Sequence, residues 1–221
     1  MHLTRFELNP ARRATRHLLA SPHRLHGAVM KAFPAAHREP TEDGRVLWRL
    51  DQTPNQTLLY IVSPHRPDLT HLVEETGWPA TSTWDTRPYG PLLDQMAAGQ
   101  EWAFRLTANP TRSVRRTSDA DTKRYGHLTV TQQTDWLLGR VERLGFTIPP
   151  AVGDEPDVAI RGRDRRKFDR QGTTVTLTLA TYEGRLRVAD PALFRRTLTH
   201  GVGSAKGYGC GLLTLARVRP T

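Results

Sequence analysis

The chain repeats a short sequence pattern about half-way along its length. The residues Arg5, Asn9, Pro10 and Arg12 return, in the same spacing, as Arg105, Asn109, Pro110 and Arg112. Each copy starts in a segment that alternates like a strand, and Asn-Pro ends that segment because proline donates no backbone hydrogen bond. In a chain of 221 residues this offset predicts two copies of one unit. Chance agreement at four positions is the alternative.

The order of predicted elements supports two similar halves. Each half approximates strand, helix, two strands, helix, strand, which is the order of a ferredoxin-like unit. The expected elements of the first half are 2–8, 11–19, 22–33, 46–50, 57–62 and 68–76. Those of the second half are 101–107, 131–144, 158–160, 173–182, 185–189, 191–199 and 212–218. The fold class that we predict is therefore α+β, with two tandem ferredoxin-like βαββαβ domains of the RNA-recognition type.

The boundary between these domains is expected in a stretch rich in Gly, Pro, Thr and Ser, at 77–98. We predict an N-terminal domain over 1–92 and a C-terminal domain over 99–221. A charged turn is expected between the strands at 158–160 and 173–182, and a second turn at Glu183-Gly184. Fold alone does not give function, because this architecture serves many activities.

The net charge of the chain limits the class of partner that it is expected to bind. The 32 basic and 22 acidic residues give a net charge of +10, which favours an anionic partner such as nucleic acid. Arginine makes up most of the basic residues and suits bidentate phosphate contacts, although a GC-rich genome also favours arginine codons. No apolar stretch is long enough to span a membrane, and the first residues lack the apolar core of a signal peptide. We therefore expect a cytoplasmic protein that does not bind membranes.

The glycine-rich segment 201–211 is the most unusual part of the chain. It fails as a P-loop, because Lys206 is followed by Gly207 and a helix precedes the segment. Too few residues follow it for a dinucleotide-binding unit. It remains a loop between a helix and the last strand, whose backbone can approach a phosphate closely. Tight packing of the loop against the helix is the alternative.

This segment resembles the C-terminus of the CasE family. The sequence Gly-Val-Gly-Ser-Ala-Lys-Gly-Tyr-Gly-Cys-Gly-Leu-Leu at 201–213 is accompanied by family-like segments at 3–10, 21–26, 31–34, 103–110 and 182–186. The family comprises endoribonucleases of the type I-E Cascade complex of CRISPR systems. The resemblance implies binding of the repeat stem-loop in precursor RNA and cleavage at the 3′ base of the stem. It also implies a 2′,3′-cyclic phosphate product, no metal or other cofactor, and retention as a subunit beside other Cascade proteins.

Two other functions stay open at this point. A related CRISPR subunit could bind RNA without cutting it, and a ribosomal or regulatory RNA-binding protein would also be basic. The second of these leaves the paired resemblance at both ends of the chain unexplained.

Histidine chemistry points to one helix. The ordinary histidine pKa lies near working pH, so histidine serves as acid or base in RNA cleavage. His23 and His26 lie three residues apart, after the helix start Ser21-Pro22, and share roughly one helical face. The resemblance places His26 on the catalytic histidine of the family and His23 where some relatives carry tyrosine. It also makes Lys31 a candidate phosphate contact.

A metal site at His23 and His26 is not expected, because no acidic or cysteine ligand lies nearby in the sequence. The single cysteine, Cys210, allows neither an internal disulfide nor a cysteine-based zinc site.

The densest basic run follows the strand at 158–160. We expect it to form an arm that contacts phosphates along an RNA stem, with a merely solvated hairpin as the alternative. Its members are Arg161, Arg163, Arg165, Arg166, Lys167 and Arg170. In the glycine-rich loop, the expected RNA contacts are Gly203, Lys206, Gly207 and Gly209. A weaker candidate patch comprises Arg112, Arg115, Arg116, Lys123 and Arg124.

Overall fold

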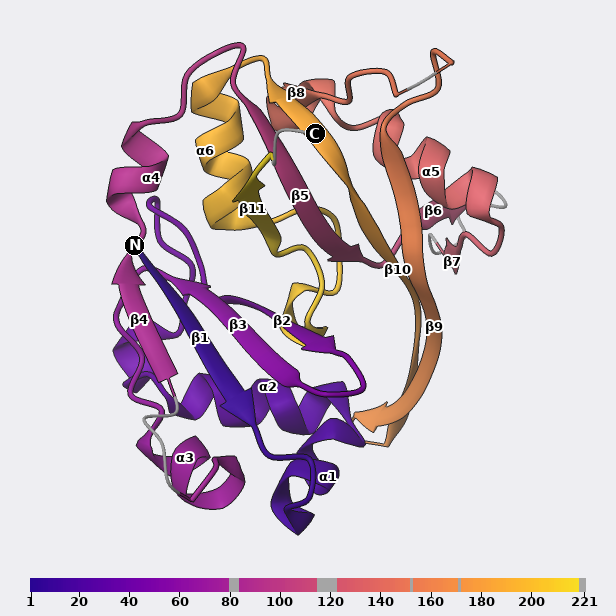
Figure 1. The fold of residues 1–221 in the computed structure, drawn as a ribbon. Helices are drawn as coiled ribbons and strands as arrows, with labels where there is room; N and C mark the ends of the chain where they lie inside the picture. The colour runs from indigo at the N-terminus through magenta and orange to yellow at the C-terminus, as the bar shows by residue number, and fades with distance from the viewer. Residues whose placement is uncertain (80–83, 115–122, 152, 171, 219–221) are drawn as a thin grey trace.

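Two antiparallel sheets form the framework of the chain in the computed structural model (Figure 1). The structure describes residues 1–79, 84–114, 123–151, 153–170 and 172–218. Arg115 and Arg116 of the weaker basic patch lie outside these residues.

The N-terminal sheet has four strands in the order β2-β3-β1-β4. Its strands are β1 (His2–Leu8), β2 (Leu47–Gln52), β3 (Thr57–Ser63) and β4 (Trp84–Pro88). Its helices are α1 (Arg13–Leu19), α2 (Pro22–Lys31) and α3 (Thr70–Thr76), with a short η1 (Ala35–His37). Leu25 and Val29 of α2 are buried in one core cluster with Phe6 and Leu8 of β1, because apolar residues four apart lie on the same face of a helix.

The C-terminal sheet has the order β11-β5-β10-β8, and β9 also pairs with β10. Its strands are β5 (Glu101–Ala108), β8 (Phe146–Thr147), β9 (Val158–Arg170), β10 (Thr173–Val188) and β11 (Leu213–Arg217). Its helices are α5 (Val130–Leu138) and α6 (Pro191–His200), with η2 (Glu142–Leu144) and η3 (Lys206–Tyr208). A small separate sheet pairs β6 (Thr111–Val114) with β7 (Lys123–Gly126), and α4 (Gly90–Asp94) precedes β5.

The repeated sequence pattern marks equivalent places in the two sheets. β1 and β5 are both inner strands, each with a pairing partner on either side, and each ends at Asn-Pro. Asn9 and Asn109 are both buried but accept different hydrogen bonds, from Ala11 N (3.0 Å) and from Thr178 N in β10 (3.0 Å). The predicted α+β, tandem ferredoxin-like fold is confirmed.

Two predicted turns and one predicted helix end are wrong. The charged stretch after Ile160 is not a turn, because β9 continues to Arg170 in register with β10. Glu183-Gly184 is not a turn either, since β10 is paired on both sides there and Gly184 gives room for Asp157 O, which a Cβ would overlap. The helix expected over 131–144 ends at Leu138, with Gly139 as its C-cap.

The expected boundary stretch is also more ordered than its composition indicated. β4 lies within 77–98 and pairs with β1, so this stretch completes the N-terminal sheet. The division of the chain into 1–92 and 99–221 stays a prediction.

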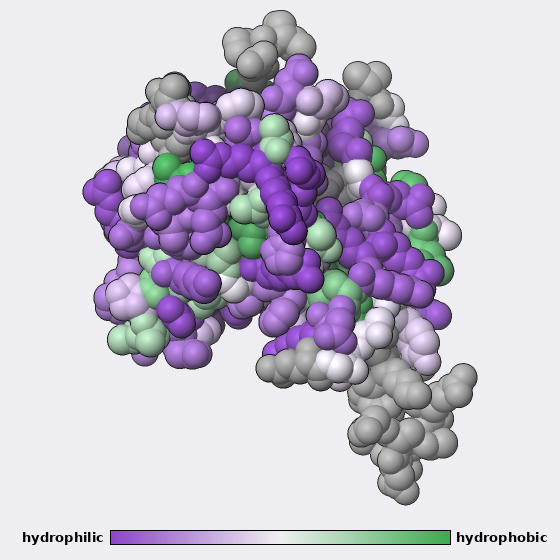
Figure 2. All heavy atoms as spheres, turned by 90° about the horizontal axis from the view of Figure 1, so that it is seen from below, coloured by the Kyte–Doolittle hydropathy of each residue, from purple (hydrophilic) through white to green (hydrophobic). Residues whose placement is uncertain are grey.

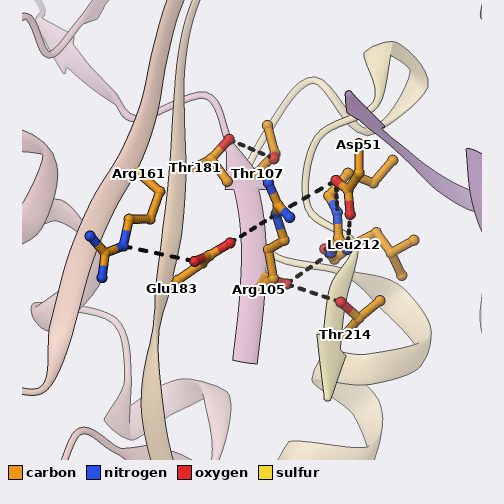
Figure 3. A network of polar contacts seen from close by, with 9 residues as sticks. Asp51, Arg105, Thr107, Arg161, Thr181, Glu183, Leu212 and Thr214 are labelled. Atoms are coloured by element: carbon orange, nitrogen blue, oxygen red, sulfur yellow. Dashed lines mark hydrogen bonds and ion pairs between the residues drawn. The ribbon is translucent and has the colours of Figure 1, made fainter. Parts of the chain in front are cut away.

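A buried arginine joins the two sheets. Arg49 on β2 donates two hydrogen bonds to Asp51, at 2.8 and 2.9 Å, and others to Arg105 O and Leu212 O of the C-terminal sheet. Figure 3 shows the adjoining network, in which Arg105 lies between Asp51 and Glu183 (N–O distances of 3.7 and 3.3 Å). These contacts fix how the glycine-rich loop of one unit meets α2 of the other.

Candidate active site

Helix α2 places the two histidines at its first turns. Ser21 is the N-cap and Pro22 the first helical residue, as predicted, although the Ser21 side chain makes no capping hydrogen bond. Leu25 and Val29 of this helix are buried in the core, and His23 lies on the side of the helix away from Leu25. His23 is therefore exposed, while His26 is partly buried beside the C-terminal unit.

A pocket of about 410 Å³ surrounds these histidines. Three segments meet the start of α2 there: Arg45 before β2, Arg170 at the end of β9, and residues 203–208 of the glycine-rich loop. The loop touches the catalytic candidate directly, because a Cβ on Gly207 would lie 3.5 Å from His26 Nε2. The tertiary structure thus brings together His23, His26, Arg170, Lys206, Gly203 and Gly207 of the predicted site residues.

Burial and neighbouring charges favour the neutral form of His26. Burial lowers the pKa of His26 most, and the charges of His23, Arg45 and Arg170 lower it further. Burial, with a contribution from Arg45, also lowers the pKa of Lys206, whose Nζ donates to Gly203 O at 2.8 Å. Every charged side chain among the pocket-lining residues is basic. The pocket therefore suits an anion lying beside an imidazole that can accept a proton.

Gly209 is explained by packing. It is buried, has a φ of +81°, and a Cβ there would lie 2.6 Å from Cζ3 of Trp48 on β2. Its contact with RNA stays a prediction, because the packing alone already requires glycine.

We expect Gly209→Ala to destabilise the fold by about 2–4 kcal/mol, through overpacking against Trp48 and left-handed backbone strain. Chemical denaturation measures this loss. Gly207→Ala is the matched control, because its Cβ would meet His26 only at an ordinary contact distance. Equal stability of the two variants would contradict the packing explanation.

The basic run does not form a free arm with one basic face. Strand alternation places Arg163, Arg165 and Lys167 on one side of β9, and Arg166 and Arg170 on the other. The hairpin curves down to α2 (Figure 1), and its end lies against the first turn of that helix.

Single members of the run also have separate partners. Arg161 is paired with Glu183 (3.8 Å), Arg166 with Asp164 (2.7 Å), and Arg163 donates to Leu128 O. Lys31 lies at the far end of α2, exposed and outside the pocket.

Four pocket residues were missed from the sequence: Arg45, Ser204, Ala205 and Tyr208. Arg45 precedes β2 and belongs to no motif, so only the fold reveals it. Tyr208 lies inside the glycine-rich segment, and its ring packs edge-on against Phe168 of β9 at 4.9 Å between centroids. An aromatic residue among glycines was the available signal for Tyr208.

The surface around this end of the molecule is mostly hydrophilic (Figure 2). Over the described residues, no cluster of three or more His, Cys, Asp or Glu could hold a metal. Within the same residues, no helix has the length and apolar character needed to cross a membrane.

Comparison with known proteins identifies the family. The model of the family described as "CRISPR associated protein" matches residues 1–217, nearly the whole chain. The chain belongs to this family. A fellow CRISPR-associated protein, the endoribonuclease Cse3 of Thermus thermophilus, is 33% identical over 223 residues, covering 98% of this chain and 100% of the relative.

Solved structures of CRISPR-associated proteins share the fold along the full chain. Cse3 bound to a 19-nucleotide RNA has a TM-score of 0.82 at 31% identity, covering 98% of this chain and 100% of that one. Thermus thermophilus Cse3 with an RNA representing a pre-cleavage complex has a TM-score of 0.81 at 32% identity, with 97% and 98% coverage. Cas6e of Escherichia coli K-12, at 22% identity, has a TM-score of 0.67 with 99% and 100% coverage and supports the fold. The resemblance to the CasE family is thereby confirmed.

Proposed function

We propose that this protein is a metal-independent endoribonuclease. It binds the CRISPR repeat stem-loop in precursor RNA and cuts at the 3′ base of the stem. The observation that carries this proposal is the pocket in which the glycine-rich loop meets His26 amid basic side chains. The likeness to an endoribonuclease solved with RNA in a pre-cleavage complex supports it.

The reaction that fits this pocket is attack by the RNA's own 2′-oxygen. A bond forms between the 2′-oxygen and the adjacent phosphorus, and the bond from phosphorus to the departing 5′-oxygen breaks. His26, whose lowered pKa favours the neutral imidazole, accepts the proton of the 2′-hydroxyl. His23, exposed on the same side of α2, supplies a proton to the 5′-oxygen. The products are a 2′,3′-cyclic phosphate and a 5′-hydroxyl, and exchange with solvent restores both histidines.

Backbone and side chains of the pocket hold the phosphate. The start of α2 contributes N–H groups and partial positive charge, and Lys206 and Arg170 contribute full charges. Lys31, Gly203, Gly207 and Gly209 remain candidate RNA contacts.

The outward side of β9 is assigned to the RNA stem. A-form RNA hides its base edges in a deep major groove, so Arg163, Arg165 and Lys167 would contact phosphates and read shape. We expect Arg165→Gln with Lys167→Gln to weaken RNA binding and to make its salt slope shallower by roughly 1–2, since each lost phosphate contact contributes about 0.9 or less.

Filter-binding titrations across a salt series measure this effect. Arg187→Gln is the control, because Arg187 pairs with Glu101 near the other end of β10. An unchanged slope in the double variant would remove these residues from the RNA interface.

Retention of the product would make the protein a subunit of the Cascade complex. The basic surface that binds the stem before cleavage still faces the same stem afterwards, so slow release follows. Assembly on a transcript also places the protein in the cytoplasm.

The test incubates wild-type protein with its repeat RNA in excess EDTA. We expect one cut at the 3′ base of the stem and a 5′ fragment that ends in a 2′,3′-cyclic phosphate, identified by mass spectrometry. Tight binding without a cut would instead establish a non-catalytic RNA-binding subunit. Cutting that EDTA abolishes would reject the metal-independent mechanism.

A further inference from the structure

Arg45 is held at the junction of the two units. Its backbone N–H donates to Thr199 O at the end of α6, at 3.2 Å. Gly44 allows this approach, since a Cβ there would lie 2.9 Å from the same oxygen. The side chain of Arg45 then lines the pocket with His26 and Lys206.

The guanidinium of Arg45 has a hydrogen-bond donor without an acceptor. Over the part of the chain that the structure describes, its buried Nε has no hydrogen-bond partner, and no carboxylate forms an ion pair with it. Arg49 and Arg187, in contrast, are both paired with carboxylates. Buried polar groups without partners are rare in folded proteins, and His26 Nδ1 in the same pocket is a second such atom. Two unpartnered polar groups that line one basic pocket favour binding of an anionic ligand there.

We infer that Arg45 binds the non-bridging oxygens of the phosphate that is cut and stabilises the charge that develops on them. The inference rests on the proposed endoribonuclease function and adds a residue that no sequence motif marks. Attack by the 2′-oxygen places additional negative charge on these oxygens as phosphorus becomes five-coordinate. A planar guanidinium matches two such oxygens at once, and fixed donors of this kind stabilise a transition state more than its ground state.

Arg45 also affects the pKa of His26, the proposed base. Its charge is one of those that lower the pKa of His26, after burial and His23 and before Arg170. Lys206 faces the same pocket. Loss of the Arg45 charge lets the pKa of His26 rise, so less neutral imidazole is present at a given pH.

The experiment compares Arg45→Gln and Arg45→Lys with wild type. Arg196→Gln is the matched control, because Arg196 is an exposed arginine on α6 outside the pocket. Three quantities are measured on repeat RNA: the cleavage rate at saturating protein, the dissociation constant, and the pH profile of cleavage at subsaturating protein. Melting temperatures report whether each variant folds.

We expect Arg45→Gln to lower the saturated rate by about 10²–10³-fold, with a dissociation constant within a few-fold of wild type. The acid limb of its pH profile should move to higher pH. Arg45→Lys should keep the limb near its wild-type position but remain slow, because an ammonium group lacks the two-pronged geometry. If Arg45→Gln does not fold, the cleavage rate of Arg45→Lys alone tests the inference.

A wild-type rate in Arg45→Gln, or a loss confined to affinity, would overturn the inference. So would an Arg45→Lys variant that cuts at the wild-type rate. These results differ from failure of the proposed function, in which wild-type protein itself does not cut.

Discussion

Replacing His26 by alanine is expected to slow cleavage of repeat RNA by about 10²–10⁴-fold, the contribution of one positioned acid–base group. The imidazole is the partly buried base candidate of the pocket, with Gly207 against its Nε2. RNA affinity should stay almost unchanged, because the phosphate contacts belong to other side chains. Single-turnover rates and equilibrium binding, both measured in EDTA, separate the two quantities.

A matched histidine variant controls for loss of any imidazole. His65 stacks on His37 with ring centroids 3.7 Å apart and lies outside the pocket. His65→Ala should cut at the wild-type rate. Cleavage by His26→Ala at the wild-type rate would exclude His26 as the base.

The pH dependence of wild type follows from the same residue. Burial and nearby positive charges lower the pKa of His26, so its neutral form persists below the usual histidine range. A base must be neutral, so cleavage by free enzyme should fall only as pH drops below about 6.5, the ordinary histidine value. An acid limb above that value in subsaturating rate measurements would argue against His26 as the base.

Replacing Arg49 by methionine is expected to cost about 3–5 kcal/mol of unfolding free energy, as removal of one partner from a buried ion pair does. The change leaves Asp51 without its bidentate partner. It also removes the hydrogen bonds to Arg105 O and Leu212 O that join β2 to the other sheet. Urea denaturation measures the loss.

Arg87→Met is the control for this stability prediction. Arg87 pairs with Asp85 on β4, where the two side chains are 79% and 48% exposed, and such pairs contribute little. Its unfolding free energy should stay within about 0.5 kcal/mol of wild type. The double variant Arg49→Met with Asp51→Leu should recover part of the loss, because no buried charge is then unpaired. A stable Arg49→Met protein would show that the junction does not depend on this network.

Much of the local structure follows from short-range signals. The alternation in β1 and β5, the Ser21-Pro22 start of α2 and the Asp190-Pro191 start of α6 act within a few residues. Asp190 accepts from two N–H groups in the first turn of α6, as a capping aspartate does. The glycine-rich loop was placed correctly between α6 and β11 for the same reason.

The wrong predictions for β9 and β10 have a different physical origin. Charged and glycine residues of β9 and β10 favour turns locally, but pairing on both edges of β10 makes one long strand of them. The same pairing spreads the basic run over two faces. The local composition of a segment does not determine which strands pair with it.

The sequence alone determined the two ferredoxin-like units, the family resemblance and the histidines at the start of α2, because these depend on spacing within continuous segments. Only the tertiary structure decided what surrounds His26. Arg45, Arg170 and the glycine-rich loop are far apart along the chain and meet through the packing of two sheets joined at Arg49. Burial and charge at that meeting point lower the pKa of His26. The sequence does not reveal this effect, because the residues that bury His26 and supply the charges are brought to it only by the fold.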